Sequence, residues 1–398
     1  AQNSLMMHVP DEKKPALPEP GSEAMAHSER LHALIKAEIQ AQAGSIPFAR
    51  FMELTLYTPG MGYYSGGLHK FGREGDFTTA PETSALVSQS LAMQCAQVLA
   101  TLEHADVLEA GAGSGIMAAD ILDELERLGQ LPERYFILEL SAELRQRQQQ
   151  TLPARVPHLL EKVQWLDALP VSGFRGVILG NELLDAMPVQ MFRIVDGEVC
   201  ELHVVVEGEG FSYEAKQATE ELTAAVRQLE TQLGEAFVEG YESEINLAAA
   251  GWLKSLSEIL QQGLILFVDY GFPRHEFYHP QRGCGTLMCH YRHHAHPDPL
   301  VLVGLQDITA HVDFTAMAET AQASGLDVLG FTTQAHLLLS LGIEQRVAEA
   351  EDVIQVAQQI KQLVLPSEMG ELFKAIAFGK GLDLALTGFS FQDQRARL

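Results

Sequence analysis

A glycine-rich turn, LEAGAGSG at residues 108–115, is the first stretch whose residue types could do chemistry. Glu109 ends an apolar run, and Gly111, Gly113 and Gly115 let the backbone turn tightly and approach a ligand that a Cβ atom would exclude. The spacing E-x-G-x-G-x-G differs from the dinucleotide fingerprint G-x-G-x-x-G and argues against NAD. It suits S-adenosylmethionine, whose carboxylate can accept backbone N–H groups near a helix N-terminus while Glu109 faces its amino group.

Two further acidic residues end the next two apolar runs. Glu139, followed by Leu140, ends RYFILEL, where a carboxylate can accept both hydroxyls of a ribose. Asp167, followed by Ala168, ends KVQWLDAL, where it can accept from an adenine amino group. Because the carboxyl ends of parallel strands meet at one edge of a sheet, we expect these residues to bind one ligand. The pattern predicts a nucleoside-containing cofactor without phosphate; an NAD-type site and a purely structural turn are the alternatives.

Alternating strands and helices must position these residues. From residue 105, short apolar runs alternate with helical stretches, which predicts βαβ units and a parallel sheet with helices on both faces. The runs GLILFVDYGF, LDVLGFTTQ and LFKAIAFGKG are expected as later strands of the same sheet. The stretch 189–213 alternates around a turn signal at Asp196-Gly197, so we predict an inserted hairpin or meander there. A helical pair is expected to follow, up to about residue 262.

The predicted organisation has four parts. The segment before Ser28 is rich in Pro, Glu and Lys with few large apolar residues, so we expect a disordered tail there and a capped amphipathic helix after it. The parts are the tail (1–27), N-terminal helices with a cofactor-covering loop (28–103), a core (104–190 and 263–398) and an inserted hairpin with helices (191–262).

Several longer motifs follow one another between residues 51 and 374: FMELTLYTPGMGYY, FGREGDFTTAPE, EAGAGSG, ILELS, GNELLDAMPV, VDYGF, GTLMCHYRHHAHPDP, QDITAHVDFT and PSEMGELFK. In these motifs the chain resembles the MidA-type family of class I methyltransferases. The resemblance implies an α/β, Rossmann-like class I methyltransferase sheet with an N-terminal helical region and an inserted substrate-binding subdomain. It also implies S-adenosyl-L-methionine as cofactor and methylation of an arginine of a protein such as a respiratory complex I subunit. Ala112, where the family pattern has Pro, is a local departure.

The segment GNELLDAMP, after the fourth expected strand, supplies the candidate catalytic residues. Class I architecture places this segment beside the transferred methyl group. A guanidinium stays charged in water, and carboxylates around it can orient it and concentrate electron density on one nitrogen. Glu182 is the first candidate for gripping the substrate, before Asp185 and Asn181, for which a helix cap is the alternative. Asp269, after the next strand, is a further candidate.

The stretch GCGTLMCHYRHHAHPDP, residues 283–299, combines two cysteines with four histidines. Cys284 and Cys289 are separated by four residues, at the loose end of zinc-ligand spacing, and no second cysteine pair follows. We therefore predict no metal site. We interpret the stretch as a substrate-side loop in which His290 lines a cleft against QDITAHVDF, with a plain surface loop as the alternative for the later histidines.

The glycine-rich segment 57–82 is too long for an idle connection and is expected to cover the cofactor. Asp76, Phe77, Thr78 and Thr79 are the candidates in its GDFTTAPE motif: the threonines could donate hydrogen bonds while the phenylalanine shields the ligand. A structural Ω-loop is the alternative.

Charge and composition limit the partners. With 27 basic and 53 acidic residues the formal charge is −26, which repels a phosphate backbone and excludes nucleic acid as the expected partner. A cationic partner or simple solubility explains the acidic balance. No apolar stretch approaches the roughly 20 residues of a membrane span. Four cysteines in 398 residues indicate a reducing compartment, and we expect the cytoplasm.

The function expected from these observations is S-adenosylmethionine-dependent methylation of an arginine side chain. The expected partner is a protein that presents this arginine, with a homodimer left open. Two other functions stay open: an assembly factor that binds the cofactor without catalysis, and a small-molecule methyltransferase.

Overall fold

The computed structural model describes residues 17–67, 79–349, 353–365 and 369–398. Its main sheet has the strand order β15-β16-β10-β5-β2-β3-β4, with β14 paired to β10. Strands β4, β3, β2, β5 and β10 run parallel, whereas β16 is antiparallel to both of its neighbours. This arrangement confirms the predicted α/β fold class. The strands are β2 (Asp106–Ala110), β3 (Tyr135–Leu138), β4 (Val163–Leu166), β5 (Phe174–Asn181), β10 (Leu260–Phe272), β14 (Val312–Asp313), β15 (Asp327–Thr333) and β16 (Phe373–Lys380).

Helices cover both faces of the main sheet because its strands are apolar on both sides. The consecutive residues Val107 and Leu108 of β2 are fully buried in two different core clusters. The first cluster includes Leu91 and Leu122 from helices on one face, and the second includes Leu253 from the other face. The helices around the sheet are α3 (Ala80–Thr83), α4 (Ala85–Leu99), α5 (Ile116–Arg127), α6 (Ala142–Arg155), η1 (Pro157–Lys162), α8 (Leu247–Ile259), α9 (Arg274–Phe277), α10 (Phe314–Ala323), α11 (Gln334–Ser340), α12 (Ile343–Ala348), α13 (Val353–Val364), α14 (Met369–Leu372), η2 (Thr387–Phe389) and η3 (Arg395–Arg397).

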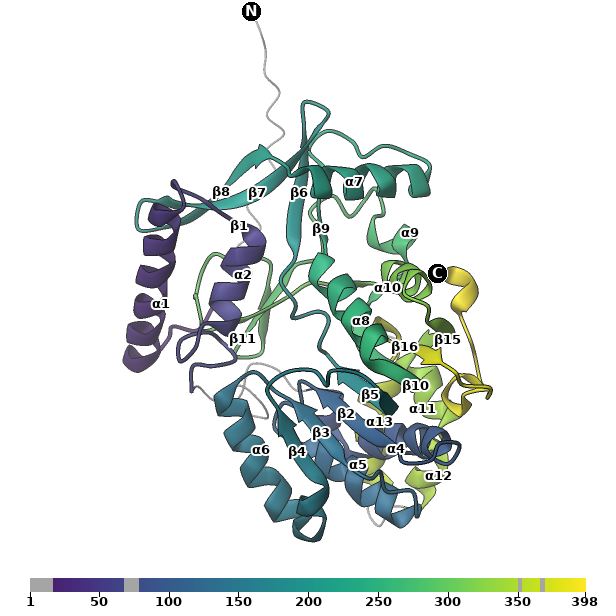
Figure 1. Cartoon of the computed structure of the whole chain (residues 1–398). Helices are drawn as coiled ribbons and strands as arrows, with labels where there is room; N and C mark the ends of the chain where they lie inside the picture. Colours follow the sequence, from purple (N-terminus) through teal and green to yellow (C-terminus); the bar gives the residue numbers. More distant parts are fainter. Residues whose placement is uncertain (1–16, 68–78, 350–352, 366–368) are drawn as a thin grey trace, which may run out of the picture.

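Two smaller sheets stand at one end of the main sheet, in the upper half of Figure 1, together with α1, α2 and α7. The larger is antiparallel with the order β1-β7-β6-β9, and β8 pairs with β7. The other has the order β12-β11-β13. Their elements are α1 (Ser22–Ala41), β1 (Ile46–Pro47), α2 (Phe48–Tyr57), β6 (Gln190–Val195), β7 (Glu198–Glu207), β8 (Gly210–Gln217), α7 (Glu220–Leu233), β9 (Glu242–Ile245), β11 (Met288–Tyr291), β12 (His294–His296) and β13 (Asp307–Thr309).

The structure differs from the sequence-based boundaries in two places. Helix α1 begins at Ser22, six residues before the expected cap at Ser28, so the tail boundary at residue 27 is wrong. The helix extends because His27 is buried and its Nε2 atom lies 2.8 Å from the carbonyl oxygen of Met61. The expected helical pair after the meander is interrupted by β9, which pairs with β6. None of the helices in the described ranges has the length and apolar character needed to cross a membrane.

Candidate active site

A cavity of about 520 Å³ lies at the carboxyl ends of β2, β3 and β5. This volume lies within the range of pockets that hold small molecules and cofactors. Eight of the predicted site residues line it: Glu109, Gly111, Gly113, Glu139, Leu140, Asn181, Glu182 and Thr79. Tyr57 and Tyr64 from the N-terminal region and Trp252 from α8 complete the wall. The main sheet, the N-terminal helices and the inserted segment therefore all contribute to one site.

The three glycines of the turn after β2 have different roles. All three have positive φ angles, 69° at Gly111, 53° at Gly113 and 85° at Gly115, a region in which other residues are strained. A Cβ atom on Gly115 would lie 3.2 Å from the Cα atom of Gln148, so this glycine allows α5 to approach α6. A Cβ atom on Gly113 would meet no protein atom within 4 Å. Because Gly113 also lines the cavity, its backbone is open to a ligand.

Glu109 is a buried acid with one satisfied oxygen. Its side chain is 1% exposed, and its Oε2 atom accepts a hydrogen bond of 2.5 Å from the hydroxyl of Tyr135. Its Oε1 atom is buried and has no hydrogen-bond partner within the described residues. Burial raises the pKa of Glu109 to about 7. A ligand with an amino group would supply the missing donor, so this acid fits the amino end of S-adenosylmethionine.

Glu139 is held by the residues that follow it. Its two oxygens accept hydrogen bonds of 2.9 Å from the backbone N–H of Ser141 and of 3.1 Å from Nε2 of Gln148. The same Gln148 nitrogen donates to the carbonyl oxygen of Gly113 at 3.0 Å. Burial raises the pKa of Glu139. Gln148 therefore connects the glycine turn to the second acid, a function that no sequence signal marked within RQRQQQ.

Among the remaining cofactor candidates, those within the described residues do not line the cavity. Asp167 lies beyond the end of β4, with its side chain 89% exposed and 2.8 Å from Nη2 of Arg145. The same Arg145 nitrogen donates to the carbonyl oxygens of Glu139 and Leu166, which holds the pair at the outer edge of the sheet. Neither Asp167 nor Ala168 lines the cavity, and the expected contact of Asp167 with adenine stays a prediction. Gly115 does not line it either, and Asp76, Phe77 and Thr78 lie outside the described residues.

Strand β5 ends in an unusual backbone conformation. Glu182 has a φ of 48°, a strained region for a residue with a Cβ atom, and its N–H donates to the carbonyl oxygen of Val268 at 2.9 Å. Burial, together with the charge of Asp269, raises the pKa of Glu182 to about 8. The amide of Asn181 donates weakly to Glu182 at 3.4 Å, and its Oδ1 atom is buried without a partner among the described residues. Both residues line the cavity.

Asp269 positions this segment rather than lining the cavity. Its Oδ2 atom accepts the backbone N–H groups of Leu183, Leu184 and Asp185 at 3.1, 2.8 and 3.3 Å, and its Oδ1 atom accepts that of Tyr270 at 2.9 Å. Burial raises the pKa of Asp269 to about 7. Asp185 is also buried and lies behind the wall formed by its neighbours. A direct substrate contact by Asp269 or Asp185 is therefore not part of this arrangement.

Two stacked tyrosines, Tyr57 and Tyr64, form another part of the cavity wall. The rings of Tyr57 and Tyr64 have centroids 5.5 Å apart and an interplanar angle of 24°. The hydroxyl of Tyr57 donates to the carbonyl oxygen of Ala186 at 2.6 Å, and that of Tyr64 donates to Oδ1 of Asp307 at 2.8 Å. The sequence predicts a covering loop in this region but does not identify Tyr57 and Tyr64 as site residues. Trp252 was missed because its helix carries no distinctive motif.

The cysteine- and histidine-rich stretch supplies β11 and β12 of the small sheet, and the third strand, β13, comes from the segment QDITAHVDF. His290 lies on β11 and pairs in register with Asp307. The sequence predicts that His290 lines a cleft, but it is not among the residues that line this cavity. Burial lowers its pKa. Arg292 and His293 have φ angles of 45° and 62° and form the tight turn between β11 and β12. Within the described ranges, no group of three His, Cys, Asp or Glu side chains is placed to hold a metal ion.

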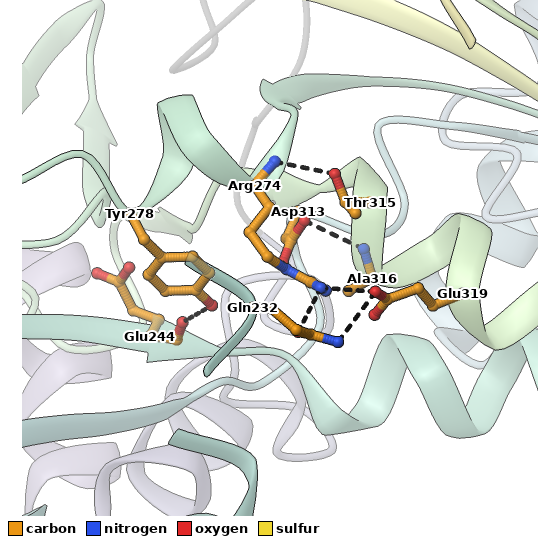
Figure 2. A network of polar contacts seen from close by, with 8 residues as sticks. All are labelled: Gln232, Glu244, Arg274, Tyr278, Asp313, Thr315, Ala316 and Glu319. Carbon is orange, nitrogen blue, oxygen red and sulfur yellow. Dashed lines mark hydrogen bonds and ion pairs between the residues drawn. The ribbon is translucent and has the colours of Figure 1, made fainter. Parts of the chain in front are cut away.

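Glu244 fixes the start of this stretch. Its buried carboxylate accepts the backbone N–H groups of Thr286 and Leu287, at 2.8 and 3.2 Å, and the hydroxyl of Thr286 at 3.1 Å. Burial raises the pKa of Glu244 to about 7. Figure 2 shows that the hydroxyl of Tyr278 reaches the backbone oxygen of Glu244, at 2.7 Å, beside the buried guanidinium of Arg274. The contacts of Glu244 leave no room for a side chain at Gly285, the second glycine of GCGTL.

Gly285→Ala is expected to lower the free energy of unfolding by about 2 to 3 kcal/mol. Gly285 has a φ of 75°, and a Cβ atom there would lie 2.2 Å from Oε1 of Glu244. The loop would have to move and lose hydrogen bonds to the carboxylate. Gly283→Ala is the matched control, because its Cβ would come no closer than 3.8 Å to a neighbour. Urea unfolding measures both, and equal stabilities would contradict the role of Glu244.

The comparisons with known proteins agree with this geometry. Residues 90–332 match the Methyltransf_28 family model of S-adenosyl-L-methionine-dependent methyltransferases. The chain belongs to this family. A crystal structure of a Burkholderia thailandensis protein bound to S-adenosyl-homocysteine is 45% identical, covers 96% of this chain and 100% of its own, and has a TM-score of 0.91. The main sheet is thus a class I methyltransferase sheet, and the cofactor of this methyltransferase is S-adenosylmethionine.

More distant relatives carry names that specify a reaction. A Drosophila melanogaster protein named protein arginine methyltransferase NDUFAF7 homolog, mitochondrial, is 28% identical over 92% of this methyltransferase and 89% of its own chain. The Homo sapiens protein of the corresponding name is 27% identical over 84% of this methyltransferase and 80% of its own chain. These names place the relatives in mitochondria, which contradicts the cytoplasmic location expected from the cysteine content.

Proposed function

We propose that this methyltransferase transfers the methyl group to an arginine side chain of a protein. The observation that carries the proposal is the end of β5, where the Glu182 carboxylate and the unpartnered Oδ1 atom of Asn181 offer acceptors to a group rich in N–H donors. The names of the relatives as protein arginine methyltransferases support it. A subunit of respiratory complex I is the substrate that the family resemblance implies.

The residues of the cavity divide into a cofactor half and an acceptor half. S-adenosylmethionine, when bound, supplies a methyl group on a positively charged sulfur for displacement by a nucleophile. Glu109 would accept hydrogen bonds from its amino group, Glu139 from its ribose, and the backbone at Gly111 and Gly113 would approach its methionine part. Asn181 and Glu182 lie on the acceptor half, and the stacked tyrosines also line the cavity.

Glu182 can both orient a guanidinium and receive its proton. A guanidinium nitrogen that gains a methyl group must lose one N–H proton, so that the methylated product keeps a single positive charge. The carboxyl group of Glu182, with a pKa of about 8, can accept this proton once it is ionised, which happens as the pH rises through that value. The second acceptor, Asn181, can accept a hydrogen bond from another N–H group and so fix the orientation of the guanidinium.

The turnover rate is expected to rise with pH through a single ionisation near pH 8. Only the ionised form of Glu182 can accept a proton, and its raised pKa keeps it protonated below that value. We would measure kcat from about pH 6.5 to about pH 9.5. Saturating cofactor and substrate are used so that a change in cofactor affinity, caused by titration of Glu109, does not alter the measured rate. A rate that is flat across this range would contradict a base at Glu182.

Methyl-labelled S-adenosylmethionine added to extract of the source organism tests the proposed substrate class. We expect the label in a polypeptide when the purified protein is added. Label only in small molecules would favour the small-molecule alternative, and no label despite measurable cofactor binding would favour an assembly factor that acts without catalysis. Heat-inactivated protein is the blank for labelling by other enzymes of the extract.

A further inference from the structure

One polar residue occupies a core position of helix α6. The buried residues of this helix are Leu144, Gln148 and Leu152, which follow one another at intervals of four and therefore lie on one face of the helix. Gln148 is 0% exposed. Burying an amide is costly unless hydrogen bonds replace those that it loses to water, so a glutamine between two core leucines indicates a specific role.

Three hydrogen bonds hold the side-chain amide of Gln148. Its Nε2 atom donates to the carbonyl oxygen of Gly113 at 3.0 Å and to Oε2 of Glu139 at 3.1 Å. Its Oε1 atom accepts from the indole Nε1 of Trp165 at 3.0 Å. An indole nitrogen can only donate, so it must face the amide oxygen, and this turns the amide NH₂ group toward the two acceptors. Trp165 therefore fixes the orientation of the amide.

The carboxylate of Glu139 is held at both of its oxygens. One oxygen accepts from the backbone of Ser141 and the other from Gln148, and each carboxylate oxygen has a second lone pair that a ligand can use. Burial raises the pKa of Glu139, and these hydrogen bonds oppose that rise because they stabilise the ionised form. Glu139 lines the cavity, whereas neither Gln148 nor Trp165 does. Both residues therefore act on a ligand through Glu139 and the glycine turn.

We propose that Gln148, oriented by Trp165, is a positioning residue for recognition of the cofactor's ribose. It holds the Glu139 carboxylate so that the second lone pair of each oxygen is available to the two ribose hydroxyls. Its bond to Gly113 ties this carboxylate to the turn that approaches the methionine part. The role requires the expected ribose contact of Glu139 but no arginine acceptor, so it and the proposed function can fail separately.

Two ligands separate ribose recognition from the rest of cofactor binding. S-adenosylhomocysteine and its 2′-deoxy analogue differ in one ribose hydroxyl, so the ratio of their dissociation constants, measured by calorimetry, reports how well that hydroxyl is bound. The wild type should prefer S-adenosylhomocysteine by about tenfold to a hundredfold, as expected for a hydrogen bond to a charged group. Q148L should lose most of this preference. W165F, which keeps an aromatic ring but removes the indole N–H, should lose about fivefold, the equivalent of one net hydrogen bond.

Q94L is the matched control, because it makes the same substitution in another buried glutamine outside the cavity wall. Gln94 on α4 is also 0% exposed, its Oε1 atom accepts the backbone N–H of Gly388 at 2.8 Å, and its Nε2 atom donates to Gln97 at 2.7 Å. Both variants lose buried hydrogen bonds, and their melting temperatures measure the cost. Only Q148L should change the ligand ratio. A lower melting temperature of Q148L with the ratio of the wild type would mean that Gln148 only supports the fold, and would overturn the positioning role.

E139Q distinguishes an error about the ribose from an error about Gln148. The expected result is loss of the preference in E139Q and in Q148L, with a smaller loss in W165F. Loss in E139Q alone would leave Glu139 at the ribose and refute the role of Gln148. A wild type without preference, or a preference that survives in E139Q, would place the ribose elsewhere and refute the role as well. If Q148L does not fold, the ratio in W165F decides, and a ratio equal to that of the wild type would overturn the proposal.

Discussion

The Glu182→Gln variant is expected to keep its affinity for S-adenosylmethionine and to lose turnover, with kcat lower by about a hundredfold to a thousandfold. The amide has the size of the carboxylate but presents two N–H donors where a guanidinium needs acceptors. It also cannot receive the proton that the methylated nitrogen loses. Calorimetry measures the affinity for S-adenosylmethionine, and single-turnover assays measure the rate of methyl transfer.

Glu53→Gln is the matched control for this variant. Glu53 also lines the cavity, but its side chain is half exposed and pairs with Arg50 at 2.7 Å, so it should matter far less to the chemical step. A Glu182→Gln rate close to that of the wild type would remove Glu182 from the reaction and leave Asn181 as the remaining acceptor on that wall. Loss of cofactor binding in Glu182→Gln would instead show that the residue belongs to the cofactor half.

The Gly113→Val variant is expected to bind S-adenosylmethionine at least a hundredfold more weakly while remaining folded. An added Cβ atom would meet no protein atom within 4 Å, and Gly113 lines the cavity, so the side chain starts in the space of the cavity. At a φ of 53° a β-branched residue is also strained, by about 1 to 3 kcal/mol. Calorimetric titration with the cofactor checks the affinity, and circular dichroism checks the fold.

Gly129→Val separates backbone strain from loss of the binding surface. Gly129 follows α5, has a φ of 68°, and likewise has no atom within 4 Å of an added Cβ. The two variants therefore carry similar strain, but only one lies at the cavity. Equal cofactor affinities in Gly113→Val and the wild type would show that the methionine part of the cofactor does not approach this turn.

The main sheet and the first two acids could be predicted because they depend on local patterns. Apolar runs that end in Glu109, Glu139 and Asn181 indicate strand ends, and parallel strands bring such ends together. The same reasoning did not predict where the side chain of Asp167 lies. Its run also ends at the correct edge, but Arg145 holds the side chain in solvent, and no pattern in the sequence predicts that ion pair.

The rest of the site depends on contacts between distant segments, which periodicity does not reveal. Tyr64 reaches Asp307 across 243 residues, and Gln148 reaches Gly113 across 35. Asp269 seemed catalytic because it ends a strand, yet its oxygens are used by the backbone of the neighbouring loop. Glu244 gave no signal at all, although it decides the path of the loop that starts the histidine-rich stretch.

Arginine methylation at the end of β5 is tested most directly by locating the transferred methyl group. The purified protein and its Glu182→Gln variant would each be incubated with extract of the source organism and isotopically labelled S-adenosylmethionine, and the labelled protein sequenced by tandem mass spectrometry. We expect the label on a guanidinium nitrogen of an arginine with the wild type and its absence with the variant. Label on a lysine, a histidine or a carboxyl group, or equal labelling by both proteins, would contradict arginine methylation through Glu182.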